Sequence, residues 1–311
     1  MIQTALKKLQ NHILFFFFFA LGSIVILIGG LLLHRNSASR ITSIRSFVKA
    51  GNLKTSATVL DRQMVPIPEG EFIMGSNDGE LNERPCRLIY LDAFMLDKFE
   101  VTNIQYKRFI DATNKNPPRY WTNRDFPKGQ PYFPVVGVSW DDALAYCKSV
   151  GKRLPTEAEW EKACRGTDGR TYPWGNDWNP RLANVGLNQV DKWPITFDSA
   201  WQLLQMTEAD SGFPSLQPIG SFPNSGSLYG IFDLVGNASE WVADWYNWNG
   251  YWDLPLVNPV GLGPSWNRSL RGSGWFDRLG QEDQVSYLSR CSTRNSSHSY
   301  DDPRLGFRCA R

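Results

Sequence analysis

The stretch that decides the fold of this 311-residue chain reads RLPTEAEWE, residues 153–161. Thr156 and Glu159 have the spacing of a capping box, in which each side chain bonds the backbone N–H of the other residue. The stretch therefore predicts a helix that begins after Thr156 and carries Trp160. Pro155 stands just ahead of the cap and separates this helix from an earlier one.

Outward from this helix, the sequence predicts short elements joined by turns. The earlier helix begins after Ser139, a hydroxyl residue suited to an N-cap, and ends at Gly151. Residues 65–76 alternate apolar and polar side chains between turn signals, which is typical of a strand and hairpin. From Thr171 onward the sequence favours turns and short strands.

The composition is that of one large globular domain. The chain is 42% apolar and 14% aromatic, which is ample for a hydrophobic core. Its 13 Trp and 26 Gly favour a loop-rich fold packed by aromatic side chains over a helical bundle. The formal net charge is only +2, so we expect no nucleic-acid partner.

An apolar run near the N-terminus predicts a membrane anchor. Residues 13–33 carry no charge, and as a helix they would span a hydrocarbon core of about 30 Å. The run is longer than the apolar part of a cleaved signal peptide, which is usually about 7–15 residues. We therefore predict a cytoplasmic N-terminus (1–12), one transmembrane signal anchor (13–33), a stalk (34–63) and a globular domain (64–311).

Two features of the sequence disagree about the side on which that domain lies. Two lysines precede the span and four basic residues follow it closely, which by the positive-inside tendency would leave the domain in the cytoplasm. Four of the five cysteines fall into two pairs of related spacing, which favours disulfides and an oxidising compartment. Long domains can cross a membrane regardless of flanking charge, so we expect the domain to be extracytoplasmic.

Eight short motifs follow one another along the domain: PEGEFIMGS (68–76), FEVTN (99–103), GVSW (137–140), RLPTEAEWE (153–161), YPWGN (172–176), LYG (228–230), VGN (235–237) and LGFR (305–308). In these residues and in their order the chain resembles the formylglycine-generating enzyme family, also named sulfatase-modifying factor domains. The resemblance covers residues 64–311. It implies an α+β fold that is related to C-type lectins and has little regular secondary structure.

The resemblance also implies how the cysteines pair. In family members with disulfides, Cys147 would pair with Cys309, and Cys164 with Cys291. Four free buried thiols remain the alternative. Cys86 is left over, and we expect a partly buried residue without reactivity.

The family's catalytic cysteines are missing from this chain. Family enzymes oxidise a substrate cysteine to formylglycine with two active-site cysteines and copper, and Cu(I) prefers thiolate ligands. Asp277 and Ser286 stand where those cysteines should be, and no cysteine occurs between Trp275 and Arg290. Ser239 stands where the family has an active-site tryptophan. We therefore expect no copper.

Calcium is the metal that the resemblance leaves in place. The family's site corresponds to the carboxylates of Asp233 and Glu240 with the carbonyls of Gly236 and Ala238, and Ca²⁺ prefers such hard oxygen ligands. A second family site would use the residues Asn184, Val185, Asp210 and Phe213. Alignment back from Pro218 puts Ser211 rather than Asp210 at its acidic position, and an insertion precedes it.

These expectations favour a membrane-anchored, extracytoplasmic module that binds a ligand or serves as an accessory subunit. The former catalytic groove, formed by Ser239, Trp275, Asp277 and Arg294, would hold an unknown protein or peptide ligand. Arg294 matches a substrate-site arginine of the family, although a structural ion pair explains it equally well. The alternative is a formylglycine-generating enzyme or related oxidase that needs no cysteine pair, to which Cys86 or Asp277 would contribute.

Overall fold

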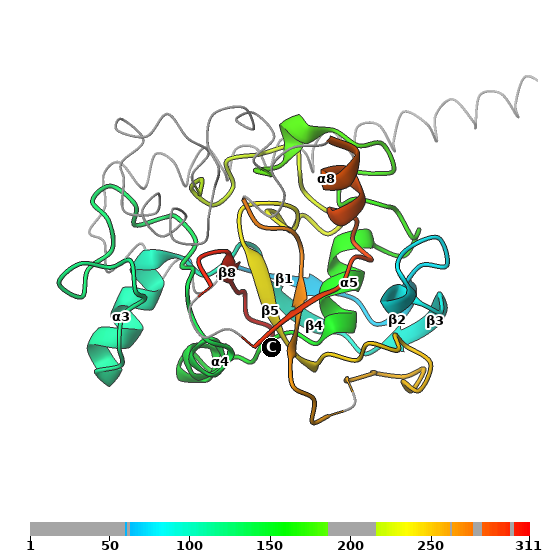
Figure 1. The fold of residues 1–311 in the computed structure, drawn as a ribbon, viewed down its shortest axis with the longest axis horizontal. Helices are drawn as coiled ribbons and strands as arrows, with labels where there is room; N and C mark the ends of the chain where they lie inside the picture. The colour runs from blue at the N-terminus through cyan, green and yellow to red at the C-terminus, as the bar shows by residue number, and fades with distance from the viewer. Residues whose placement is uncertain (1–59, 61–62, 186–215, 262, 276–281, 299–301) are drawn as a thin grey trace, which may run out of the picture. The chain divides into compact units, whose positions relative to one another are not determined.

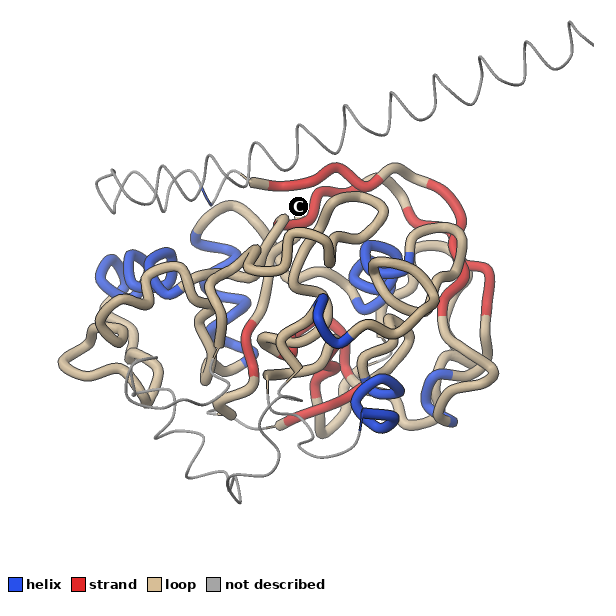
Figure 2. The backbone as a smooth tube through the Cα atoms, turned by 90° about the horizontal axis from the view of Figure 1, so that it is seen from above, coloured by secondary structure: helices blue, strands red, loops and turns tan. Residues whose placement is uncertain are grey.

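The computed structural model of the chain describes residues 60, 63–185, 216–261, 263–275, 282–298 and 302–311. These residues form small sheets and few helices, joined by long irregular segments (Figures 1 and 2). The mixed α+β class and the scarcity of regular structure agree with the expectation from the sequence.

Four strands near the start of the domain form two antiparallel pairs. β1 (Met64–Ile67) pairs with β4 (Phe94–Asp97), and β2 (Gly70–Met74) pairs with β3 (Arg87–Leu91). The strands predicted over 65–76 are therefore present, but the hairpin is wrong because β1 and β2 do not pair with each other. Alternation of apolar and polar residues indicates a strand, whereas its partner is chosen by packing with distant parts of the chain.

A four-stranded sheet occupies the middle of the domain, with the order β7-β6-β5-β8. Its central strand β5 (Ser239–Trp245) runs antiparallel to β6 (Arg268–Arg271) and parallel to β8 (Leu305–Gly306). The edge strand β7 (Asn295–Ser297) pairs with β6. Residues from the last quarter of the chain thus surround β5.

The capping box at residues 153–161 forms as predicted. Thr156 Oγ1 accepts the N–H of Glu159, and the Glu159 carboxylate accepts the N–H of Thr156 at 2.8 Å. Helix α5 (Glu157–Arg165) begins directly after this cap. Helix α4 (Trp140–Ser149) begins after Ser139, whose hydroxyl accepts the N–H of Asp142. The other helices within the described residues are α3 (Asn103–Thr113), α8 (Glu282–Leu288) and the 3₁₀ turns η1 (Leu81–Glu83) and η2 (Pro180–Leu182).

Two hydrophobic cores lie against β5, one for each direction of its side chains. Trp241 belongs to the core that also holds Tyr106 of α3 and Tyr146 of α4. Val242 belongs to the core that also holds Trp160 of α5. Because successive strand residues point to opposite faces, β5 separates these cores. Figure 1 shows the corresponding arrangement, with α3 and α4 to one side of β5 and α5 to the other.

Both disulfides that the resemblance implies are present in the structure. Cys147 at the end of α4 is joined to Cys309, and Cys164 at the end of α5 is joined to Cys291. The bonded residues are 162 and 127 positions apart in the sequence. Each disulfide therefore ties a helix to the C-terminal part of the chain. The fifth cysteine, Cys86, is free and exposed, which corrects the expectation that it is partly buried.

The predicted membrane span, residues 13–33, lies outside the described residues, as does nearly all of the predicted stalk. Among the helices that the structure describes, none has the length and apolar character needed to cross a bilayer. The anchor thus stays a prediction from the sequence.

Candidate functional site

Two residues of the predicted ligand groove come together at the start of β5. The Ser239 hydroxyl lies 3.5 Å from the carbonyl of Gly272, and the N–H of Trp275 donates to the carbonyl of Asn237 at 2.8 Å. Both side chains are buried, and Trp275 is fully enclosed. The third residue, Asp277, lies outside the described residues. The described part of the proposed groove is thus closed by its own side chains.

The guanidinium of Arg294, the fourth predicted groove residue, bonds to other residues of the domain. Its Nε and Nη2 donate to the two carboxylate oxygens of Glu157, at 2.7 and 2.8 Å. Its Nη1 donates to the carbonyls of Asn82 and Asn247, at 2.7 and 3.0 Å. The guanidinium also lies over the Tyr251 ring, 4.4 Å from its centroid. The ion-pair explanation of this arginine therefore matches its contacts.

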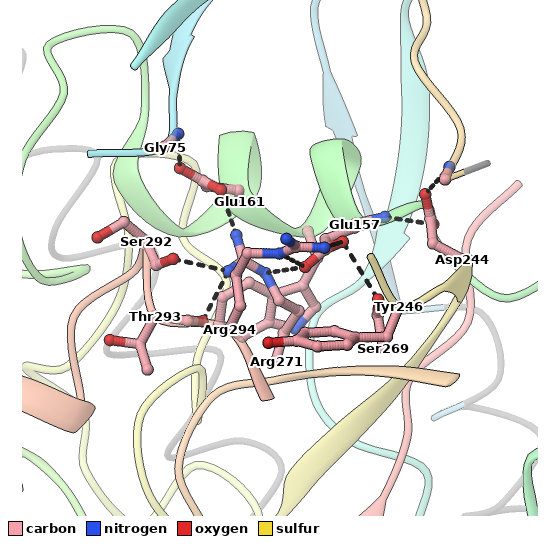
Figure 3. A network of polar contacts seen from close by, with 12 residues as sticks. Gly75, Glu157, Glu161, Asp244, Tyr246, Ser269, Arg271, Ser292, Thr293 and Arg294 are labelled. Atoms are coloured by element: carbon pink, nitrogen blue, oxygen red, sulfur yellow. Dashed lines mark hydrogen bonds and ion pairs between the residues drawn. The ribbon is translucent and has the colours of Figure 1, made fainter. Parts of the chain in front are cut away.

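Arg294 is part of a larger buried cluster between α5 and β6, which we name the balanced cluster. Figure 3 shows Glu157 and Glu161 reaching from α5 toward Arg271 and Arg294. Arg271 pairs with Glu161 and also donates to the carbonyls of Ser292 and Thr293. Arg165 also pairs with Glu161, at 2.9 Å, and Asp244 accepts the N–H of Glu157. The cluster thus contains three carboxyl groups and three guanidinium groups: Glu157, Glu161, Asp244, Arg165, Arg271 and Arg294.

Charge pairing dominates the electrostatics of this cluster. Burial alone would raise the pKa of Glu157, but Arg294 and Arg271 lower it below its ordinary value. Burial opposes the charge of Arg294, yet Glu157 raises the pKa of this guanidinium above its ordinary value. Both groups are therefore charged in the folded protein at neutral pH.

Asp244 joins the balanced cluster to the segment that follows β5. Its two carboxylate oxygens accept the backbone N–H groups of Glu157, at 2.7 Å, and of Gly261. Burial, followed by the nearby charge of Glu157, raises the pKa of Asp244 to about 7. This carboxyl group thus titrates near neutral pH.

A second buried cluster surrounds Arg308, and we name it the acidic cluster: Glu100, Asp233, Glu240 and Arg308. Arg308 donates to both oxygens of Glu240, each at 2.7 Å. Glu100 accepts the N–H of Ala238 at 3.2 Å, and Asp233 accepts the N–H of Gly220 at 2.7 Å. Three carboxyl groups here face one guanidinium group.

Burial disfavours the charged form of two carboxyl groups in the acidic cluster. Burial, then the charges of Asp233 and Glu240, raise the pKa of Glu100 well above its ordinary value. Burial raises the pKa of Asp233 to about 6, although the N–H of Gly220 and the charge of Arg308 oppose this rise. An excess of buried negative charge favours either a bound proton or a bound cation.

The donor chemistry of the acidic cluster fits Ca²⁺, the metal that the family implies. Asp233 and Glu240 would supply carboxylate oxygens, and Gly236 and Ala238 would supply carbonyls between them. Glu240 would have to share its oxygens with Arg308. In the described part of the chain, no three acidic, histidine or cysteine side chains form a metal-binding group by themselves, so the carbonyls are essential to this site.

The second predicted calcium site is only partly described. Asn184 lies beside the first site, because its carbonyl accepts the N–H of Asn237 at 2.9 Å and its side-chain amide donates to Asn237 Oδ1 at 3.2 Å. Val185 follows it and is buried. Asp210 and Phe213 lie outside the described residues, and so does Ser211.

Glu100 is a residue of the acidic cluster that the sequence did not predict as part of a site. It lies in the FEVTN motif, which supported the family resemblance without receiving a role. Its carboxylate accepts the side-chain amide of Asn237, a residue 137 positions further along the chain. No local sequence pattern predicts a contact between residues so far apart in the chain.

Ser286, at the position of the second family cysteine, serves the structure of α8. Its hydroxyl donates to the carbonyl of Asp283 at 2.9 Å, and its carbonyl accepts the Tyr172 hydroxyl at 3.1 Å. Neither contact involves Ser239 or Trp275.

Comparison with known proteins gives three consistent findings. The model of the family described as "Sulfatase-modifying factor enzyme 1-like domain" matches residues 49–311. The "Formylglycine-generating enzyme" of Bos taurus is 31% identical, over 80% of this chain and 74% of that protein. The "Inactive C-alpha-formylglycine-generating enzyme 2" of Mus musculus is 33% identical, over 80% of this chain and 86% of that protein. Among solved structures, PvdO from Pseudomonas aeruginosa superposes with a TM-score of 0.61 at 25% identity, over 80% of this chain and 93% of that one.

Proposed function

The chain belongs to the family of sulfatase-modifying factor enzyme 1-like domains, and we propose that it is a member without formylglycine-generating activity that acts as a binding or accessory module. Relatives named as inactive formylglycine-generating enzymes match the chain as well as the active ones do. The proposal therefore depends on which residues occupy the site of the reaction.

The observation that carries the proposal is the state of the five cysteines. Four are paired in the two disulfides, and all four are fully buried. The fifth, Cys86, is exposed at the entrance to β3, where its N–H donates to Asn77. Two free thiols are needed to hold Cu(I) in the manner of the family enzymes. A copper–thiolate centre does not fit these residues.

The alternative oxidase would need Cys86 near the residues of the former groove. Cys86 precedes Arg87, whose guanidinium donates to the carbonyl of Leu254 at 2.6 Å, in the segment that follows β5. Ser239 is the first residue of β5. Cys86 is exposed, whereas Ser239 and Trp275 are buried, so the thiol does not share a surface with these two side chains. These positions favour the non-catalytic interpretation.

The module would be anchored in the membrane by residues 13–33, with its domain outside the cytoplasm. Its two disulfides support this location, because disulfides persist in oxidising compartments. A reporter enzyme that is active only in an oxidising compartment, fused after Arg311, should be active. Activity of a cytoplasmic reporter at the same position would contradict the proposed location.

Ca²⁺ would stabilise the module at the acidic cluster, and an unknown protein or peptide ligand would bind at the start of β5, outside the buried side chains of Ser239 and Trp275. Ca²⁺ supplies positive charge for Asp233 and Glu240, which lie in a cluster with excess carboxylate. The replacement of a family tryptophan by the smaller Ser239 supports a changed ligand.

The test is a Cu(I) titration of the full chain in detergent, together with an assay on a peptide that carries the sulfatase cysteine motif. We expect no aldehyde in the peptide and only the weak Cu(I) binding of a single thiol, which a Cys86→Ser variant should abolish. Aldehyde formation, or tight Cu(I) binding that survives in Cys86→Ser, would refute the proposal.

A further inference from the structure

Large apolar side chains are exposed mainly in two segments of the chain. Of the ten such side chains in the part that the structure describes, eight lie within residues 81–88 and 248–266. Trp248 and Trp252 are each about two-thirds exposed, at 67% and 66%. Scattered exposed apolar residues are ordinary on protein surfaces, but a concentration of this kind marks an interaction site.

The two segments lie side by side. The Asn82 side-chain amide donates to the Tyr246 hydroxyl at 2.6 Å, and the N–H of Tyr251 donates to the carbonyl of Arg84 at 2.8 Å. Further along, the N–H of Tyr90 donates to the carbonyl of Leu256 at 2.8 Å. We name the resulting surface the aromatic face: Leu81, Leu88, Trp248, Trp252, Leu256 and Val257.

The backbone that carries the aromatic face is held by hydrogen bonds from arginine side chains. Arg294 of the balanced cluster donates to the carbonyl of Asn247, and Arg87 donates to the carbonyls of Tyr251 and Leu254. Gly250 has φ +73° and packs against the carbonyl of Arg84, where a side chain would collide with it. The tryptophans thus extend from a rigid backbone, so little conformational entropy is lost when a partner covers them.

The border of the aromatic face is acidic. Asp92 bonds Asn258 beside Val257, Asp253 follows Trp252, and Glu80 precedes Leu81; all three carboxylates are exposed. The only basic residues within 76–92 and 246–261 are Arg84 and Arg87, which are partly buried and donate to backbone carbonyls. Arg290 also reaches this region, where it pairs with the buried Glu83 of η1. The exposed charge carried by the two segments is therefore negative.

We propose that the aromatic face binds a protein segment whose apolar side chains are flanked by lysine or arginine. Complementary charge at the border speeds encounter and rejects partners of like charge. An anionic lipid surface would be repelled, and a second copy facing the same surface would bring carboxylates against carboxylates. This surface goes beyond the proposed function, since it consists of exposed side chains and includes neither Ser239 nor Trp275, which are buried.

The test uses the full chain in nanodiscs of zwitterionic lipid and two fluorescent peptides. Both peptides have the apolar centre Leu-Trp-Leu-Trp; one carries two lysines at each end and the other two glutamates. Anisotropy, corrected with empty nanodiscs, should show at least tenfold tighter binding of the lysine peptide, with an affinity that falls as salt is added.

Variants locate the binding. The double variant Trp248→Ala/Trp252→Ala should lose at least tenfold in affinity, because exposed tryptophans that become covered dominate binding energy. Asp92→Asn/Asp253→Asn should lose several-fold for the lysine peptide alone. Leu228→Ala, which changes an apolar residue of another segment that is 55% exposed, should change nothing and is the control. All variants should keep the melting temperature of the parent.

Three results would overturn the proposal. Equal binding of the two peptides would remove the role of charge, and unchanged binding by the double tryptophan variant would remove the aromatic face. Association of two nanodiscs, or binding of phosphatidylserine vesicles, that is lost in the double variant would assign the surface to a second copy or to lipid. None of these measurements depends on the copper and aldehyde assays.

Discussion

The balanced cluster and the acidic cluster lie on either side of one residue, and they differ in how their charge is compensated. The Trp160 indole N–H donates to Glu240 of the acidic cluster at 2.9 Å, and Arg271 of the balanced cluster lies over its ring. In the balanced cluster three guanidinium groups meet three carboxyl groups. In the acidic cluster one guanidinium group lies among three carboxyl groups. The first needs nothing from outside the chain, whereas the second favours a cation.

This difference shows which part of the family's fold is stabilised independently of a bound metal or a catalytic residue. The balanced cluster joins α5 to β6 through partners supplied entirely by the protein, and none of its six members is a cysteine. The family's helix stretch at 153–161 supplies both Glu157 and Glu161 to that cluster. The framework therefore persists for a physical reason that is independent of any reaction.

The largest effect is expected from breaking the balanced cluster. Arg294→Met would leave Glu157 buried without its main partner, which should lower the free energy of unfolding by about 3–5 kcal/mol. Denaturant unfolding of the full chain measures the change. The matched control is Arg153→Met, because Arg153 also pairs with a glutamate at 2.6 Å but its side chain is 45% exposed.

The control variant should cost less than about 1 kcal/mol, since exposed ion pairs contribute little. The double variant Glu157→Gln/Arg294→Met should recover part of the loss by removing the uncompensated charge. A cost for Arg294→Met no larger than that for Arg153→Met would show that the cluster is not held by its charge balance.

The disulfides test whether the balanced cluster is coupled to its surroundings. Removing either one should cost about 2–5 kcal/mol, and the two costs should be similar because closure entropy grows only with the logarithm of loop length. Cys291 lies close to Arg294 in the sequence, whereas Cys309 does not. We therefore expect Cys164→Ala/Cys291→Ala to be non-additive with Arg294→Met, by about 0.5–3 kcal/mol.

The other disulfide supplies the comparison. Cys147→Ala/Cys309→Ala should combine with Arg294→Met additively, because Cys147 belongs to the other hydrophobic core. Double-mutant cycles from denaturant unfolding give both values. Equal coupling for the two disulfides would mean that the domain responds as a whole and that the cluster has no local partner.

Calcium should act on the acidic cluster and not on the balanced one. At a free Ca²⁺ concentration 100 times its Kd, the folded state should gain about 2.7 kcal/mol relative to the same protein in chelator. Asp233→Asn should abolish the gain; asparagine also tolerates the positive φ of 58° found there, so the backbone is preserved. Arg153→Met should keep the gain. An identical melting temperature with Ca²⁺ and with chelator would refute the calcium site.

The sequence predicts those features of the molecule that depend on neighbouring residues. The cap at Thr156 could be predicted because its two hydrogen bonds join residues only three positions apart. The disulfide pairings could not be derived from spacing, since the partners are more than 120 residues apart; they came from the family resemblance. The same limit explains the wrong hairpin between β1 and β2.

The candidate site shows the same division. The resemblance predicted Asp233 and Glu240 as members of one site, and both lie in the acidic cluster, whereas their binding of calcium stays a prediction. Glu100 was missed because it reaches the cluster from a distant motif. For Arg294 the sequence left two roles open, and only its burial against Glu157 distinguishes them. Burial and charge compensation are properties of the assembled fold.

The smallest effect on the free energy of unfolding is expected from Asp244, whose buried carboxyl group makes the stability depend on pH. Its folded pKa of about 7 lies above the unfolded value of about 3.9, so the folded state binds the proton more tightly. Its contribution to stability is complete in acid and is lost as the pH rises through 7. Between about pH 5 and pH 8 the loss should be about 2 kcal/mol.

Asp244→Asn removes this titration but also removes one acceptor, because its amide nitrogen cannot accept the second of the two backbone N–H groups. The loss of that hydrogen bond lowers the stability of the variant equally at every pH. Other buried acids add to the slope of both proteins, notably Asp97, whose pKa burial raises to about 6. The advantage of the parent over the variant should therefore shrink between pH 5 and pH 8, by about 2 kcal/mol. Parallel curves would mean that the charge of Asp244 is fully compensated, so that the balanced cluster would be balanced at every pH.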